Sequence, residues 1–140
     1  MFPLVKLIMG QKGTGKTKKL VDLVIAAVSS ANGDVVVIEK DKKLTYDIPY
    51  QARLIDAGEY GINSYPLLKG FISGLHAGNY DITHFFIDNF FKLVNDSDPA
   101  DLPGFMNWLE QFSNRENIEC IISVSADEAS CPEELKKFLL

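Results

Sequence analysis

The sequence contains little cysteine and arginine, and it has no apolar run long enough to cross a membrane. Its two cysteines, Cys120 and Cys131, have neither the spacing of a zinc site nor the number of a disulfide framework. The longest apolar stretch, residues 20–28, falls well short of the ~20 residues of a spanning helix and contains Asp22. The first residues lack the basic start and cleavage site of a secretory signal. We therefore predict no membrane span and a cytoplasmic protein.

The charge is acidic overall but unevenly distributed. The net charge is −5. Residues 1–70 carry ten basic and seven acidic side chains, a balance of +3, and residues 71–140 carry four and twelve, a balance of −8. Because nucleic-acid binding depends mainly on neutralising phosphates, this composition does not favour a nucleic-acid partner. The positive first half is suited to attract a smaller anion.

Apolar segments of strand type alternate with segments of helical period along the chain. This alternation predicts one α/β domain over residues 1–140, with a mostly parallel four- or five-stranded sheet between helices in three α/β/α layers. The predicted strands are residues 4–9, 35–38, 53–55 (a short edge strand), 85–87 and 118–124. The predicted helices begin near Lys16, Ser64, Phe105 and Ser130.

Glycine and serine predict where helices begin and end. Asn32 and Gly33 favour a left-handed stop for the first helix, and Ser130 with Glu133 favours a capping box for the last. Glycines recur every fourth residue along the second helix, which we interpret as close packing on the sheet, with a subunit contact as the alternative. They are Gly70, Gly74 and Gly78.

Four of the five tyrosines gather in the irregular stretch around residues 40–65. They are Tyr46, Tyr50, Tyr60 and Tyr65. We expect them to pack a small additional core. Stacking on a base and contact with a partner are the alternatives.

A glycine-rich segment between the first strand and the first helix has the pattern G-x-x-x-x-G-K-[ST]. It consists of Gly10, Gln11, Lys12, Gly13, Thr14, Gly15, Lys16 and Thr17, with Lys18 following in the helix. Glycines let backbone N–H groups turn toward phosphate oxygens, and the helix N-terminus adds partial positive charge. A lysine at position 16 is suited to reach the β- and γ-phosphates. The alternative is a packing turn that binds nothing.

A carboxylate follows the apolar strand at residues 85–87. Asp88 and the hydroxyl of Thr17 are the kinds of oxygen ligand that Mg²⁺ takes beside phosphates. Asp88 alone would equally fit a residue that caps a turn. Together with the glycine-rich segment, it predicts a site for Mg²⁺ and a nucleoside triphosphate.

These two motifs make the chain resemble a P-loop nucleoside triphosphatase, with Walker A at residues 10–17 and Walker B ending at Asp88. It resembles the branch that includes RecA-like and secretion ATPases, and it is also similar to short single-domain proteins automatically labelled as twitching-motility ATPases. The resemblance implies that the strand at 118–124 lies between the two motif strands. ATP is favoured over GTP as the ligand, because the N-K-x-D motif by which GTPases recognise guanine is missing.

The residues for hydrolysis are less clear than those for binding. Most of this branch places Glu directly after the Walker B Asp, whereas this chain has Asn89, which can position a water but cannot take its proton. Glu39 lies where RecA-like proteins have their catalytic Glu, although residues 39–43 also fit a solvated charged loop. We therefore take Lys16, Glu39 and Asn89 as catalytic candidates. Ser123 or Ser125 is a candidate sensor of the γ-phosphate, or an ordinary turn residue.

Only two arginines occur, Arg53 and Arg115. Because arginine commonly offsets transition-state charge in phosphoryl transfer, we expect at most slow intrinsic ATP hydrolysis unless a protein partner or second copy supplies the charge. The nucleotide state would then govern an interaction. A nucleoside-kinase-like phosphotransferase and a non-hydrolysing nucleotide-binding module remain as alternatives.

Overall fold

The described residues form five parallel strands in one sheet. The computed structural model describes residues 4–41 and 43–140. The strands are β1 (Val5–Gly10), β2 (Asp34–Glu39), β3 (Arg53–Asp56), β4 (Ile82–Ile87) and β5 (Glu119–Ser125). Their order is β1-β5-β4-β2-β3, and every neighbouring pair is parallel. The predicted parallel sheet, the edge position of β3 and the place of β5 between β1 and β4 are confirmed.

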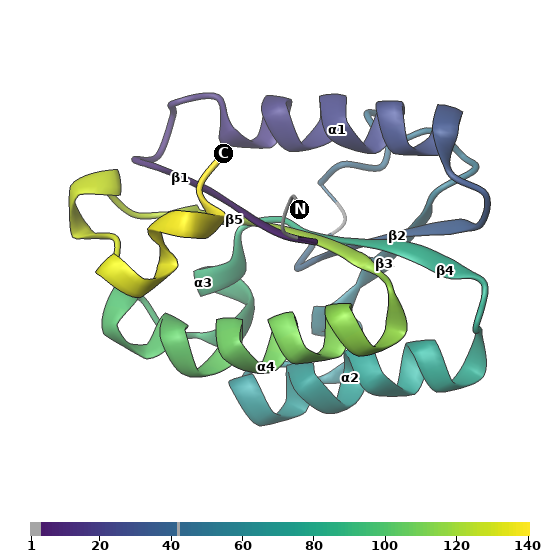
Figure 1. The fold of residues 1–140 in the computed structure, drawn as a ribbon. Coiled ribbons are helices and arrows are strands. Elements are labelled where there is room, and N and C mark those ends of the chain that lie inside the picture. The colour runs from purple at the N-terminus through teal and green to yellow at the C-terminus, as the bar shows by residue number, and fades with distance from the viewer. Residues whose placement is uncertain (1–3, 42) are drawn as a thin grey trace.

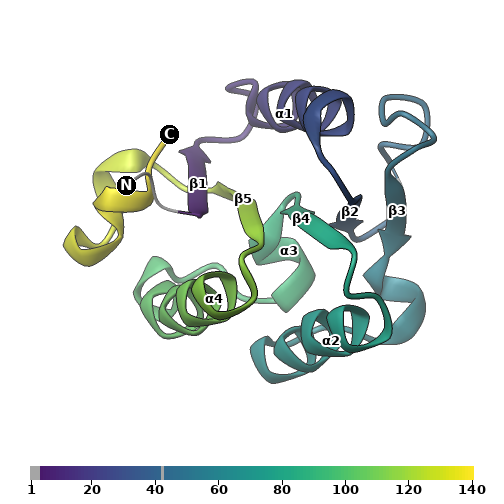
Figure 2. The ribbon, with the colours of Figure 1, turned by 45° about the vertical axis from the view of Figure 1, so that its right-hand side comes forward.

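Helices cover both faces of this sheet. Helix α1 (Lys16–Ser30) lies on one face, and α2 (Tyr65–Gly78), α3 (Phe90–Val94) and α4 (Leu102–Glu116) lie on the other (Figures 1 and 2). Alternate strand residues pack against the two layers. Val35 and Val37 face the cluster that includes Leu20 of α1, whereas Val36 and Ile38 belong to the larger cluster beneath α2 and α4. The predicted three-layer arrangement follows from this burial on both faces.

The strand register brings four polar residues to one edge of the sheet. Gly10 at the end of β1 is level with Ser125, and Ile8 is level with Ser123. Ile38 and Ile87, which precede Glu39 and Asp88, pair with each other. In parallel sheets the carboxyl ends of the strands share one edge, which is where ligands usually bind.

Helix ends differ from the prediction at two places. Helix α1 ends at an extended Ala31 (φ −73°, ψ 145°) without the predicted left-handed glycine. A Cβ on Gly33 would lie 2.1 Å from the carbonyl oxygen of Asp81, so this glycine permits close backbone approach instead. The predicted final α-helix is a 3₁₀ helix, η4 (Glu133–Phe138). Its capping box is absent, because the Ser130 hydroxyl donates to the Asp127 carbonyl oxygen.

Two further differences concern the second half of the chain. The one-turn helix α3 lies where no helix was predicted, since a single turn is too short to show a helical period. The predicted packing of Gly70, Gly74 and Gly78 on the sheet is wrong, because a Cβ at each would meet open space. Among the described residues, no helix has the length and apolar character needed to cross a membrane.

Candidate functional site

The glycine-rich loop (residues 10–17) has a backbone that depends on three of its residues being glycine. Gly13 and Gly15 adopt positive φ values of 84° and 85°, which side chains disfavour. A Cβ on Gly10 would lie 2.5 Å from Thr14 Oγ1. Thr14 in turn donates to the Gln11 carbonyl oxygen at 2.7 Å, which closes the turn. The loop is therefore a tight turn of backbone at the start of α1.

The N-terminus of α1 is suited to an anion. Gly15 occupies the N-cap, and within the described chain no side chain caps this end and no acidic residue lies in the first turn. The N–H groups of the first helical turn have no intrahelical acceptor, and the helix dipole adds positive charge there. Lys16 and Lys19 line a cavity beside this turn. A phosphate group is the chemistry that fits this end.

Lys16 folds back onto the loop. Its Nζ donates to the Gln11 carbonyl oxygen at 2.8 Å. Burial lowers the pKa of Lys16, and the nearby Asp88 carboxylate partly opposes that shift. The lysine thus lies beside the loop with an acceptor that a phosphate oxygen can replace.

Asp88 follows β4 and is buried, with 8% of its surface exposed. The hydroxyl of Ser123 donates to its Oδ1 at 2.6 Å, and the Thr17 hydroxyl lies 3.2 Å from its Oδ2. The hard oxygens of Thr17 and Asp88 therefore meet at the loop, and this donor set fits Mg²⁺. Within the described residues no cluster of three metal-binding side chains occurs, so an ion here would need phosphate or water oxygens as well.

Asn89 adopts the left-handed conformation, with φ 53° and ψ 54°. Its backbone N–H donates to Ser123 Oγ at 2.9 Å, so Ser123 links Asp88 and Asn89. Asparagine tolerates this conformation better than most side chains. The backbone thus gives a physical reason for Asn instead of Glu after the strand-end Asp.

Glu39, at the end of β2, is buried with 4% of its surface exposed. Its Oε1 accepts from the Leu44 backbone N–H at 3.3 Å, whereas Oε2 has no partner among the residues that the structure describes. Burial raises the pKa of Glu39; backbone hydrogen bonds from Leu44 and Lys43 oppose the shift, and the Asp88 and Asp56 carboxylates add to it. The interpretation of Glu39 as part of a solvated loop is therefore wrong.

Three cavities adjoin one another at the carboxyl ends of the strands. One of about 260 Å³ lies between the loop and Asp88 and is also lined by Asn89, Ser123 and Ser125. A second of about 30 Å³ is lined by Glu39, Asp88, Asn89 and Lys92, among others, and is large enough for one water. A third of about 450 Å³ continues past Gly15 and Lys16 toward Asp127 and Glu128.

The remaining predicted residues lie around these cavities or outside them. Lys12 and Gly13 line the 260 Å³ cavity, and Gln11 and Thr14 line the 450 Å³ cavity. Lys18 instead extends along α1 to Asp22, 3.3 Å away, and both side chains are exposed. The structure thus brings together every predicted site residue except the side chain of Lys18.

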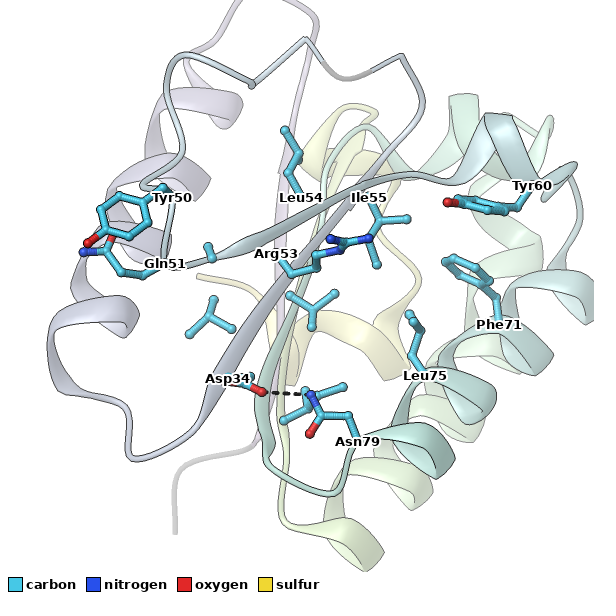
Figure 3. A pocket seen from close by; sticks show the side chains of 14 residues that line it. Asp34, Tyr50, Gln51, Arg53, Leu54, Ile55, Tyr60, Phe71, Leu75 and Asn79 are labelled. Carbon is cyan, nitrogen blue, oxygen red and sulfur yellow. Dashed lines mark hydrogen bonds between the residues drawn. The ribbon is translucent and has the colours of Figure 1, made fainter.

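A larger cavity of about 770 Å³ lies along β3, at the opposite sheet edge from β1 (Figure 3). Tyr60 stacks on Phe71 there with ring centroids 6.0 Å apart. Tyr46 and Tyr50 are 99% and 92% exposed, so the predicted tyrosine core is wrong for these two, although Tyr65 packs against Phe90. We assign this cavity no chemistry.

Sequence reasoning missed two contributors to the site. Ser123 was expected to be a phosphate sensor or an ordinary turn residue. Its hydrogen bond to Asp88 depends on the pairing of β5 with β4. Lys92 was missed because α3 was not predicted. No family model matches the chain, and no similar protein was found among curated proteins.

Proposed function

We propose that the chain is a P-loop nucleoside triphosphatase that binds ATP with Mg²⁺ and hydrolyses it slowly. One observation carries this proposal: a tight glycine loop at an uncapped helix N-terminus faces a buried carboxylate that is bonded to the loop threonine. This is the arrangement that phosphates and a hard cation require together. ATP is preferred to GTP because the guanine-recognition motif is missing.

Phosphate binding in this proposal replaces one contact and adds several. Lys16 Nζ leaves the Gln11 carbonyl oxygen and donates to the β- and γ-phosphate oxygens. Backbone N–H groups of the loop and the first turn of α1 donate to the same oxygens. The nucleoside extends into the adjoining 450 Å³ cavity, which shares Gly15 and Lys16 with the 260 Å³ cavity.

Thr17 and Asp88 would hold Mg²⁺, which when bound offsets phosphate charge. The Ser123 hydroxyl orients Asp88 through its 2.6 Å hydrogen bond. This contact fixes the orientation of the Asp88 side chain, as second-shell hydrogen bonds commonly do for metal ligands.

Hydrolysis uses the cavity of about 30 Å³, in which a water would contact Glu39 and Asn89. The water oxygen bonds to the terminal phosphorus, the bond from that phosphorus to the bridging oxygen breaks, and the diphosphate leaves with the electron pair. Glu39 Oε2, which has no other partner among the described residues, accepts the proton of the water. Its raised pKa brings the carboxylate closer to the range of an effective general base.

Nucleotide binding by Lys16→Ala tests the proposal. A fluorescent ATP analogue is titrated with Mg²⁺ into the native protein, the variant, and the control Lys136→Ala, which removes a lysine that is bonded to Glu133 in η4. Loss of a charge-assisted contact should weaken binding by roughly tenfold or more in Lys16→Ala and leave the control unchanged. Equal affinity of all three proteins would refute the proposal.

A turnover assay of the same proteins, with and without added nucleosides, separates the related activities. Phosphate release without nucleoside supports hydrolysis. Transfer of phosphate to a nucleoside would identify a kinase-like enzyme, and binding without either reaction would identify a non-hydrolysing module.

A further inference from the structure

Lys92 is a cation at the wall of the water-sized cavity. It lies in α3, three residues after Asn89, and the other four residues of that helix are buried. Its side chain is 41% exposed. Glu39, Asp88 and Asn89 line the same cavity as Lys92. The short helix therefore anchors a long, flexible cation beside the residues proposed to handle water and metal.

Asp41 holds Lys92 in this structure. Lys92 Nζ lies 3.1 Å from Asp41 Oδ2, and the aspartate side chain is 48% exposed. This hydrogen bond raises the pKa of Lys92, so the side chain is charged at neutral pH. The pair joins the loop after β2 to the helix after β4, two segments that both border the cavity.

The backbone of Asp41 is strained. Its φ is 128°, whereas the other positive-φ residues other than glycine in the described chain are asparagines with φ from 53° to 56°. Strain of this kind persists only where surrounding contacts maintain it, and it is often found at switch regions. The residue that holds Lys92 therefore has a backbone conformation that its surrounding contacts must maintain.

Neither arginine is placed to serve the proposed reaction. Arg115 is bonded to Glu116 at the end of α4, at 2.9 Å. Arg53 begins β3 and lines the 770 Å³ cavity shown in Figure 3. Lys40, Lys43 and Lys92 all line the cavity of Asp88 and Glu39, and Lys92 is the one that belongs to the helix directly after Asp88. A cation here can stabilise negative charge that develops nearby.

We propose that Lys92 offsets the negative charge that develops on the terminal phosphate during hydrolysis, and that Asp41 pairs with its ammonium group until the nucleotide binds. This inference rests on the proposed function. Lys92 stays protonated throughout and donates hydrogen bonds to phosphate oxygens, while the water proton goes to Glu39 and the leaving diphosphate takes the electron pair. An exposed ion pair such as Lys92 with Asp41 is readily exchanged for a more highly charged phosphate.

Single-turnover hydrolysis by Lys92→Gln, Lys92→Arg and Asp41→Asn tests this role. An arginine supplied to related reactions accelerates them by 10³–10⁵, and we expect a smaller loss, roughly 10- to 100-fold, when the lysine charge is removed. Lys92→Arg should keep most of the rate. Asp41→Asn should raise the rate a few-fold, and should have no effect when combined with Lys92→Gln. Lys136→Gln is the matched control.

Binding measurements separate a transition-state role from other roles. Affinity is measured for Mg-ATP, for Mg-ADP, and for Mg-ADP with aluminium fluoride, which mimics the transferring phosphate. Lys92→Gln should lower affinity only for the aluminium fluoride complex. The inference is overturned if Lys92→Gln leaves both the rate and that affinity unchanged, if it weakens all three ligands equally, or if Asp41→Asn slows the reaction. If the native protein binds none of these ligands, the proposed function itself fails.

Discussion

Glu39 and Asp88 are both carboxylates at strand ends, but their surroundings differ. Asp88 accepts a hydrogen bond from Ser123 and lies beside the Thr17 hydroxyl. Glu39 is buried with one oxygen unpartnered among the described residues, and burial raises its pKa. Contrasting environments of this kind divide the roles of two carboxyl groups. Asp88 is therefore placed to serve as a metal ligand beside Thr17, and Glu39 is placed to exchange a proton.

Replacing Glu39 with Gln should change how stability depends on pH. Because the folded-state pKa of Glu39 is raised, the folded protein binds this proton more tightly than the unfolded chain. Glu39 therefore stabilises the folded native protein at low pH. That contribution to the free energy of unfolding is lost as the pH rises from the pKa of Glu39 in the unfolded chain through its raised pKa in the folded protein. Glu39→Gln lacks that loss, so its stability relative to the native protein should increase from acid to neutral pH. Urea unfolding at several pH values measures the difference.

Glu134→Gln is the control for this measurement, since Glu134 is exposed in η4. Its stability difference from the native protein should stay nearly constant over the same range. A constant difference for Glu39→Gln as well would contradict the effect of burial. Glu39→Gln should also abolish ATP hydrolysis but leave the affinity for ATP unchanged.

Ser123→Ala should weaken Mg²⁺-dependent nucleotide binding. The substitution removes the 2.6 Å bond to Asp88 and the acceptor of the Asn89 N–H, both at a residue with 1% exposure. We expect a stability loss of about 1–3 kcal/mol, because buried groups lose their partners. The Mg²⁺ concentration at half-maximal ATP binding should also rise.

Ser113→Ala separates the local effect from general destabilisation. Ser113 is equally buried, but its hydroxyl donates to Cys120 Sγ at 3.1 Å, away from the cavities described above. This variant should lose stability without any change in the Mg²⁺ requirement. A similar change of the Mg²⁺ requirement in both variants would show that Ser123 has no specific role at Asp88.

The residues of the glycine-rich loop could be identified from sequence because their type and spacing alone define the turn. Glu39 could be placed only as a candidate, since the sequence around it is as charged as a solvated loop and burial decides its chemistry. The contact of Ser123 with Asp88 could not be predicted without knowing that β4 pairs with β5. Lys92 could not be placed from the sequence, because it lies in α3, a helix of one turn that is too short to give a periodic signal.

At the scale of elements, the strands and the longer helices were predictable because their apolar periods are regular. Segments whose conformation depends on close backbone contacts with distant residues could not be predicted in this way. Gly33 reads as a helix stop in the sequence, yet its function is to let the start of β2 approach Asp81, whose carbonyl oxygen accepts from the Asp34 N–H at 2.8 Å. The segment η4 buries Leu135 and Phe138, as the predicted helix required, although it is a 3₁₀ helix.

Gly33→Ala tests this account of the turn before β2. The added Cβ would lie 2.1 Å from a backbone oxygen, so the turn must shift, and we expect a destabilisation of about 1–3 kcal/mol in urea unfolding. Gly74→Ala is the opposite case, since its Cβ meets open space within α2, and it should stabilise by about 0.5–1 kcal/mol. Equal effects of the two substitutions would disprove the close approach at Gly33. Nucleotide affinity should be unchanged in both, because neither glycine lines the cavities around the loop.

At the scale of the whole molecule, the candidate site exists only when the sheet is assembled. Its residues follow β1, β2 and β4 or belong to β5, so Lys16 and Ser123 are distant in sequence and meet through the order β1-β5-β4-β2-β3. Local unfolding of any of these strands would separate the loop from Asp88 or Glu39. A nucleotide that requires all of them must therefore bind the folded chain and not the unfolded one.

Nucleotide binding should consequently stabilise the entire sheet. A ligand that binds only the folded state adds about 2.7 kcal/mol to the free energy of unfolding at 100 times its Kd. Urea unfolding with Mg-ATP at that ratio should shift to higher midpoint with an unchanged slope, since the surface exposed on unfolding is the same. Lys16→Ala at the same ATP concentration should show a much smaller shift, whereas Ser113→Ala should show the full shift from its lower starting stability. Stabilisation of Lys16→Ala equal to that of the native protein would mean that ATP acts elsewhere than at the glycine-rich loop.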